Sequence, residues 1–206
     1  MKLINNQYRV LDIIDEGKTI STYKVQDIKK TNLLKHLVLM DYQNESAGFF
    51  RYMKDNIYDY ANFNHPNLTQ IYFFNKISQI DNKPVSINKY YFTYEYFEGK
   101  NLFDNIGLLD FEARLDIAVQ LCAVVKYLHL RGFLLCNINK NDLFIVREGR
   151  KWTLKLAAFP YRQNLDSSCM LNKDNNLFKA PELYGSKRFD VQSDICFGHY
   201  NILYSK

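Results

Sequence analysis

Apolar and polar residues alternate over several short stretches of this 206-residue chain. A period of two residues is typical of strands that bury one face, and short runs of this kind end at polar or glycine-containing turns. The predicted strands are 8–14, 22–27, 33–41, 71–76 and 90–96. The first part of the chain is therefore predicted to be rich in β-structure.

Two longer stretches have helical spacing instead. Apolar residues between Phe49 and Asn62 recur at intervals of three and four, which predicts an amphipathic helix. A second helix is predicted from Asp110, a favourable N-cap, to Leu130, and Asp116 is expected on its solvated side. Its predicted core face consists of Leu115, Ala118, Leu121, Cys122, Val125 and Leu128.

Composition indicates a globular chain. Hydrophobic residues make up 47% of it, and the 16 Tyr and 15 Phe are expected mostly in cores rather than in a base-stacking surface. The net charge of +5 comes from Lys and Arg dispersed among acids, without a run of like charge. A nucleic-acid partner is therefore not expected.

Cysteine spacing and hydropathy indicate in which cellular compartment the protein is expected. Cys122, Cys136, Cys169 and Cys196 lie far apart, so neither a zinc site nor a disulfide framework is indicated, and a reducing cytoplasmic location is expected. No apolar segment approaches the length needed to cross a bilayer, and the N-terminus does not resemble an export signal. A membrane partner is not expected either.

Several short motifs occur in one order along the chain. They are N-H-P-N-L at 64–68, E-Y-x-x-G at 95–99, Y-L-H-x-x-G at 127–132, F-K-A-P-E at 178–182 and S-D-I at 193–195. In order and spacing they resemble the eukaryotic-type serine/threonine protein kinase family. The resemblance implies an α+β, bilobal protein-kinase-like fold, with Glu182 and Asp194 at structural motif positions.

The family's architecture implies two domains here. Residues 1–96 would form an N-lobe with an antiparallel sheet and one helix, ending at the hinge, and residues 97–206 a mostly helical but incomplete C-lobe. The later C-lobe helices of the family have no counterpart. We therefore expect a C-terminally truncated piece of a longer protein, or an apolar surface that a partner must cover.

The residues that carry phosphoryl transfer in the family are replaced. The strand lysine, its helix glutamate, the loop aspartate, the loop asparagine and the metal-binding aspartate fall on Met40, Asn56, Asn137, Asp142 and Ala158. A thioether cannot pair with phosphates, a methyl group cannot bind magnesium, and an amide cannot accept a proton at neutral pH. Lys35, five residues before Met40, is expected to be a solvated edge lysine.

The nucleotide pocket implied by the resemblance is also altered. Only Gly17 remains of the Gly-rich loop, Tyr94 narrows the pocket before the hinge, and Val38 and Phe144 are bulkier than the family's adenine-contacting residues. By contrast, positions that pack into the family's internal spine remain apolar; these are Tyr60, Ile71, Leu135 and Phe159. The scaffold is kept while the chemistry is lost.

These features favour a pseudokinase, an inactive kinase-like module that works as a signalling scaffold or regulatory protein-interaction domain. ATP and magnesium binding are expected to be weak or absent, and the expected partner is a protein or further domains of the same polypeptide. One alternative is a divergent ATP-binding serine/threonine kinase that uses Asp142. Another is a nucleic-acid-binding module, based on the pI of about 8.9 and the aromatic content.

Overall fold

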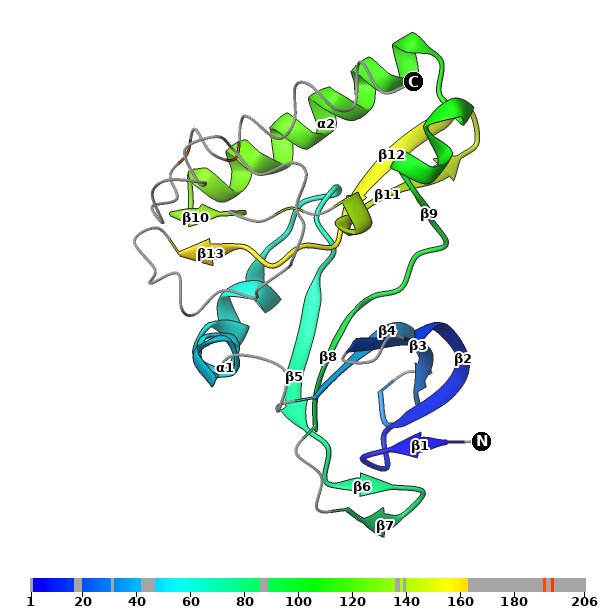
Figure 1. Cartoon of the computed structure of the whole chain (residues 1–206), viewed down its shortest axis with the longest axis vertical. Helices are drawn as coiled ribbons and strands as arrows, with labels where there is room; N and C mark the ends of the chain where they lie inside the picture. Colours follow the sequence, from blue (N-terminus) through cyan, green and yellow to red (C-terminus); the bar gives the residue numbers. More distant parts are fainter. Residues whose placement is uncertain are drawn as a thin grey trace. The chain divides into compact units, whose positions relative to one another are not determined.

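The computed structural model describes residues 2–16, 20–30, 32–41, 47–85, 89–135, 138, 140–162, 191 and 194 (Figure 1). The chain divides into two compact units. The first contains Met1–Phe63 and Gln70–Tyr96, and the second contains Asn64–Thr69 and Phe97–Lys206.

The first unit is built on an antiparallel sheet with the order β5-β8-β4-β3-β2-β1-β6-β7. Its strands are β1 (Leu3–Ile4), β2 (Tyr8–Glu16), β3 (Ile20–Asp27), β4 (Leu34–Asp41), β5 (Ile71–Lys76), β6 (Gln79–Ile80), β7 (Lys83–Pro84) and β8 (Lys89–Glu95). The five strands predicted from the alternation are confirmed to within two residues at each end. The short strands β1, β6 and β7 were not predicted.

The sheet curls because its two ends are joined by a short connection. Only Ile77 and Ser78 separate β5, at one edge, from β6, near the other. The Asn5 side chain fastens this closure: its amide donates to the Lys76 carbonyl, and its Oδ1 accepts from the backbone N–H groups of Ser78 and Gln79. The apolar cluster that results contains Ile4, Tyr8, Tyr23, Val25, Leu37, Leu39, Ile77 and Tyr91.

Helix α1 (Ala47–Asn62) covers a different face of this sheet. Its Phe50 ring lies 4.8 Å from Tyr90 and 6.2 Å from Phe74, which belong to β8 and β5. Phe49 and Met53 are fully buried. The helical spacing that predicted 49–62 therefore reflects packing of aromatic and thioether side chains onto the sheet.

The second unit combines a long helix with short strands (Figure 1). Its elements are β9 (Lys100–Asn101), η2 (Phe103–Leu108), α2 (Phe111–His129), β10 (Phe133–Leu134), η3 (Lys140–Asp142), β11 (Leu143–Glu148), β12 (Lys151–Leu156) and β13 (Tyr161–Arg162). Asp110 caps α2 as predicted, because its Oδ1 accepts from the Ala113 N–H at 2.8 Å. β11 and β12 form a hairpin whose turn begins at Gly149, with a positive φ of 64°.

The segment 64–69 belongs to the second unit through hydrogen bonds to β12. The Leu156 N–H donates to the Asn67 carbonyl, the Thr69 N–H donates to the Leu156 carbonyl, and the Asn67 amide donates to Leu154. Gln120 of α2 joins this contact by accepting from both Asn67 and the Leu154 N–H. The N-H-P-N-L motif is therefore a structural anchor.

The predicted core face of α2 was wrong in part. Leu121, Val125 and Leu128 are buried, but Leu115 and Cys122 are exposed. Ile117 and Val124 complete the buried face instead. Apolar residues occur on both sides of α2, so spacing alone could not decide which stripe faces inward. No helix within the described ranges has the length and hydropathy to cross a membrane.

Candidate functional site

Met40 lies on the face of β4 that α1 covers. It pairs across the strands with Tyr90, whose ring contacts Phe50 of α1. Directly opposed residues of antiparallel strands point to the same face, so Met40 faces the same apolar layer. Its exposed fraction is 1%. The position that carries the lysine in the kinase resemblance is thus a core position.

Asn56, at the position of the helix glutamate, is buried on α1. Its Nδ2 donates to the Tyr52 carbonyl at 2.9 Å, four residues earlier in the same helix. An amide in this arrangement satisfies the helix backbone and carries no charge. Neither Met40 nor Asn56 supplies a member of the ion pair that the family pattern requires.

Tyr94, the residue before the hinge, is part of an aromatic stack. The His36 ring lies 4.7 Å from Tyr94 with an interplanar angle of 6°, and 5.0 Å from Tyr96. The Lys24 ammonium lies 4.4 Å from the centre of the Tyr96 ring. Tyr94 and His36 are both buried, so rings occupy this side of β4 and β8.

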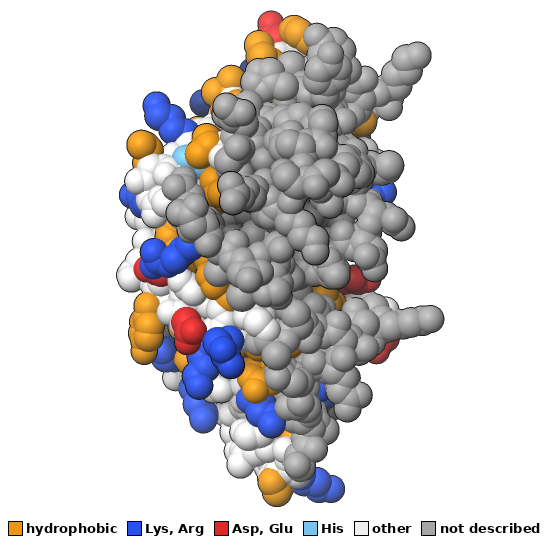
Figure 2. Space-filling view, turned by 60° about the vertical axis from the view of Figure 1, so that its left-hand side comes forward, with side chains coloured by type: hydrophobic (Ala, Val, Ile, Leu, Met, Phe, Trp, Pro, Cys, Tyr) orange, Lys and Arg blue, Asp and Glu red, His pale blue; other side chains and the backbone are white. Residues whose placement is uncertain are grey.

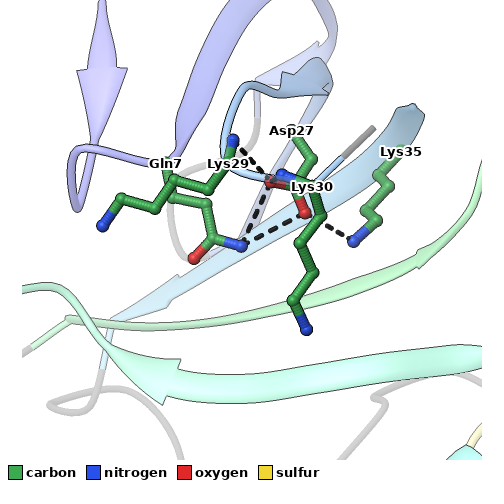
Figure 3. Close-up of polar contacts among 5 residues, drawn as sticks. All are labelled: Gln7, Asp27, Lys29, Lys30 and Lys35. Atoms are coloured by element: carbon green, nitrogen blue, oxygen red, sulfur yellow. Dashed lines mark hydrogen bonds and ion pairs between the residues drawn. The ribbon is translucent and has the colours of Figure 1, made fainter. Parts of the chain in front are cut away.

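The expectation that Lys35 is a solvated edge lysine was wrong. Lys35 is 7% exposed, and its Nζ lies 2.8 Å from the Asp27 Oδ2 in a buried ion pair (Figure 3). Its ammonium also lies 5.0 Å and 5.7 Å from the ring centres of Tyr72 and Tyr8. Strand alternation places Lys35 on the face of Leu37 and Leu39, opposite to Met40. It therefore cannot substitute for a lysine at position 40.

Asp27 is the centre of this polar group, and its carboxylate is fully buried. The Gln7 amide donates to it, as do the backbone N–H groups of Lys29 and Lys30 (Figure 3). Burial, the largest single influence, raises the pKa of Asp27, but the hydrogen bonds from Lys35 and Gln7 outweigh it and hold this pKa below its ordinary value. Asp27 is therefore a carboxylate at neutral pH.

The pairing of Asp27 with Lys35 has only an indirect signature in the sequence. Asp27 and Lys35 stand eight residues apart, on opposite sides of a turn that contains Asn32 with a positive φ of 55°. The backbone N–H of Asp27 donates to the Leu33 carbonyl and so fixes the turn. Only the exact hairpin register brings the two side chains together.

In the second unit, Asp142 ends the short helix η3 and is buried. Its carbonyl accepts from the Ala157 N–H at 2.8 Å, which ties it to the residue before Ala158. Ala158 is buried and offers a methyl group where the family pattern has a magnesium-binding carboxylate. Among the residues that the structure describes, no group of three or more His, Cys, Asp and Glu could hold a metal ion.

Phe144 lies on β11 within the same unit. Its ring makes an edge contact with Phe97, at 5.4 Å between centroids, and its backbone is opposite Asn101 of β9. The Asn101 amide donates to the Lys140 carbonyl, which fastens the start of η3 to β9. These contacts make Phe144 part of a packed aromatic pair.

Asp194 is a structural anchor. It is buried, and its Oδ2 accepts from the Leu135 N–H at 2.7 Å and lies 2.8 Å from the His129 Nε2. It therefore connects the end of α2 to Leu135. Of the predicted spine positions, Tyr60, Ile71 and Leu135 are buried and Phe159 is partly buried.

Three predicted positions, Gly17, Asn137 and Glu182, lie outside the described residues. The described positions fall into two groups: Met40, Asn56 and Tyr94 in the first unit, and Asp142, Phe144, Ala158 and Asp194 in the second.

Comparison with known proteins gives related kinases, although no family model matches the chain. A probable serine/threonine-protein kinase of Clostridium perfringens is 22% identical over 201 residues, covering 94% of this chain. The serine/threonine-protein kinase Nek1 of Mus musculus is 29% identical over 143 residues, covering 66% of this chain. The chain spans only 28% and 11% of the lengths of these two relatives.

Solved structures show the same fold. The crystal structure of the Mycobacterium tuberculosis PknI kinase domain matches with a TM-score of 0.69 at 16% identity, covering 93% of this chain and 70% of that domain. The same fold is indicated by the curled antiparallel sheet with α1, by the anchored N-H-P-N-L segment and by the kinase relatives. This chain therefore has the protein-kinase fold and is similar in sequence to serine/threonine protein kinases.

Proposed function

We propose that this chain is a pseudokinase: a catalytically inactive module that acts as a signalling scaffold or regulatory protein-interaction domain. Residues 1–96 are its proposed N-lobe and residues 97–206 its proposed partial C-lobe, except that the segment 64–69 packs with the second unit. The observation that carries the proposal is Met40, a core residue 1% exposed at the position where the family places its phosphate-binding lysine. A buried thioether cannot neutralise phosphate charge, and nearby Lys35 points to the other face of the strand.

The other described positions support this proposal. Phosphoryl transfer relies on positioning and on neutralising charge, so groups that supply cations and metal ligands contribute most of the catalysis. Asn56 bonds within its own helix and Ala158 has no ligand atom. The residues present do not fit ATP with magnesium, and binding of either is proposed to be weak or absent.

The proposed partner is a protein or a further domain of the same polypeptide, in a cytoplasmic setting that the scattered cysteines favour. Figure 2 shows Lys and Arg side chains beside hydrophobic and acidic ones on the visible face. Such interspersed charge favours a protein partner over nucleic acid or an anionic membrane.

The test is thermal unfolding of the chain during titration with ATP to millimolar concentration, with magnesium, with manganese and with neither, alongside a phosphotransfer assay. A ligand at a hundredfold its Kd adds about 2.7 kcal/mol, or roughly 5 to 11 °C in a chain of this size. We expect no shift and no phosphotransfer. Metal-dependent stabilisation with phosphotransfer would contradict the proposal.

A second candidate is a divergent ATP-binding serine/threonine kinase with residual activity. Two observations favour it: the similar proteins are named as kinases, and Asp142 places a buried carboxylate in the second unit. If Asp142 binds a metal, Asp142→Asn removes any metal-dependent shift with ATP. Asp116→Asn, a change at an exposed carboxylate of α2, is the matched control and leaves such a shift unchanged.

A further inference from the structure

The outer edge of β2, in the first unit, is only partly paired. β1 pairs with the beginning of β2, at Tyr8 and Arg9, and the Val10 N–H donates to the Lys2 carbonyl (Figure 1). Within the described ranges, no strand lies on that side of Leu11–Glu16. Because β3 pairs with β2 on the other side only, Leu11–Glu16 forms a free edge of the sheet.

This free edge is apolar as well as accessible. Leu11, Ile13 and Ile14 are 41%, 53% and 49% exposed. Three exposed aliphatic side chains in so short a stretch depart from the alternation of apolar and polar residues that a strand with one solvated face normally shows. The Ile13 N–H donates to the Asp12 Oδ1 at 2.9 Å, in a bond that is exposed to water. Both the backbone and the apolar side chains of the edge can therefore be reached from solvent.

The last strand of the same sheet differs from this edge. β7 consists of Lys83 and Pro84, both exposed, and lysine and proline on an edge strand discourage pairing with another chain. Leu11–Glu16 contains neither residue type. Two register shifts against β3 bend β2 here, but Ile13, which lies between them, remains paired with Tyr23. The free edge of β2 can therefore accept a further strand.

The charge of this edge indicates which strand fits it. Asp12, Asp15 and Glu16 are all exposed carboxylates. Two copies of β2 paired antiparallel about Ile14 would place Asp12 opposite Glu16 of the second copy, and like charges opposite each other are destabilising. A strand with Lys or Arg between apolar residues would meet opposite charges and would also cover the exposed aliphatic side chains. The occupant that fits is therefore basic, apolar and extended.

We propose that the free edge of β2 binds an extended segment of a partner protein by strand addition, and that this segment alternates Lys or Arg with apolar residues. In this mode, backbone hydrogen bonds to Leu11–Glu16 provide the affinity, and the side chains of the added segment provide the selectivity. The inference goes beyond the proposed function and does not depend on it, because an ATP-binding chain would present the same edge.

One added strand buries less surface than a standard stable interface, so weak binding is expected, with a Kd of about 10⁻⁵ to 10⁻⁴ M at low salt. The probe is a fluorescently labelled peptide of sequence K-V-K-V-K-V-K, titrated with the whole chain in the absence of nucleotide and followed by fluorescence anisotropy. The peptide E-V-E-V-E-V-E is its control and is not expected to bind. Because the attracting charges are exposed, binding of the K-V peptide should weaken as salt is added.

The first test reverses the charge of the edge. The double variant Asp12→Lys with Asp15→Lys is expected to bind the K-V peptide about tenfold more weakly and to gain binding of the E-V peptide. The double variant Asp55→Lys with Asp116→Lys is the matched control. It changes the net charge equally, at exposed carboxylates of α1 and α2, and should leave the Kd of both peptides unchanged.

The second test separates strand addition from charge attraction alone. A K-V peptide that is N-methylated at every residue keeps its charge but has no N–H groups to donate, so it should bind more than about tenfold more weakly than the parent peptide. Equal binding of the methylated and parent peptides, or unchanged binding of the parent to the Asp12→Lys with Asp15→Lys variant, overturns the inference. A dimer of the chain that Ile13→Pro dissociates also overturns it and assigns the edge to a second copy.

Discussion

The two faces of β4 each bury a long side chain, one charged and one uncharged. On one face, the Lys35 ammonium is buried beside the Asp27 carboxylate at 2.8 Å and near two tyrosine rings. On the other face, Met40 is buried against the aromatic layer under α1. The strand is the same and the burial is similar, but within the described ranges a carboxylate lies beside Lys35, whereas Met40 pairs with an aromatic residue.

A lysine buried in a kinase-like site needs a counter-ion as well as room for its side chain. A buried cation is stable only when a hydrogen-bonded counter-ion offsets its loss of water. On the face of Lys35, Asp27 supplies this counter-ion. On the face of Met40, the kinase pattern would take the counter-ion from position 56 of α1, but Asn56 is an uncharged amide that donates to the Tyr52 carbonyl of its own helix. Under the proposed function, the replacement of the lysine and the replacement of its partner are thus physically linked.

The largest expected effect on the free energy of unfolding comes from placing a cation on the face of β4 that carries Met40. Met40→Lys should destabilise the chain by about 4 to 5 kcal/mol at pH 7, the free energy needed to deprotonate an ordinary lysine. Urea unfolding of Met40→Lys and Met40→Leu measures this. The leucine variant keeps volume and polarity and should lose less than about 1.5 kcal/mol.

The double variant Met40→Lys with Asn56→Glu tests whether a carboxylate on α1 can stabilise a lysine at position 40. If positions 40 and 56 face each other as in the kinase pattern, the added carboxylate should recover part of the lost stability. A Met40→Lys variant that is as stable as the leucine variant would show that this face already provides water or a counter-charge, and would undermine the proposed loss of nucleotide binding.

The next effect is on the other face. Lys35→Met should cost about 3 to 4 kcal/mol, because it leaves the Asp27 carboxylate buried with less compensation. Adding Asp27→Asn removes that charge and retains an oxygen for the Lys29 and Lys30 N–H groups, so the double variant should be the more stable of the two. If Lys35→Met unfolds at the same urea concentration as the wild type, the ion pair contributes nothing measurable.

The unfolding free energies of wild type and Lys35→Met should depend on pH to different extents. In the wild type the pKa of Asp27 is lowered, so its contribution to stability is present above the ordinary aspartate pKa of about 3.9 and is lost as pH falls through the folded-state pKa. Without Lys35, the pKa of Asp27 should be less depressed, because burial then opposes only the hydrogen bonds from Gln7 and the backbone. The variant should therefore lose less stability than the wild type on acidification.

The gap in unfolding free energy between wild type and Lys35→Met should therefore narrow as the pH falls from 7 through the folded-state pKa of Asp27. Urea unfolding at intermediate pH values measures it. Lys54→Met, at an exposed lysine of α1, serves as control and should show no such narrowing. A gap that stays constant with pH would mean that Asp27 keeps its low pKa without Lys35.

The sequence predicted the local elements well because their causes are local. Strand alternation and the Asp110 cap depend on neighbouring residues, and both were confirmed. The face of α2 and the environment of Lys35 depend on distant partners: apolar residues fit two stripes of the helix, and Asp27 meets Lys35 only in one hairpin register. The residue types at the positions of the kinase pattern were visible in the sequence, but the burial of Met40 was not.

The smallest expected effect tests whether positions 40 and 56 still interact. Asn56→Ala removes the bond to the Tyr52 carbonyl, worth about 1 kcal/mol, while alanine favours the helix, so a loss of about 0.5 to 1 kcal/mol is expected. Combined with Met40→Leu in a double-mutant cycle, the two losses should add to within about 0.5 kcal/mol. A coupling above about 1 kcal/mol would show that the two side chains depend on each other, as a former ion-pair site would if its geometry were retained without its charges. Additivity would mean that each position has been absorbed separately, Met40 into the aromatic layer and Asn56 into its own helix, and that restoring the lysine and the glutamate would require repacking as well as charge.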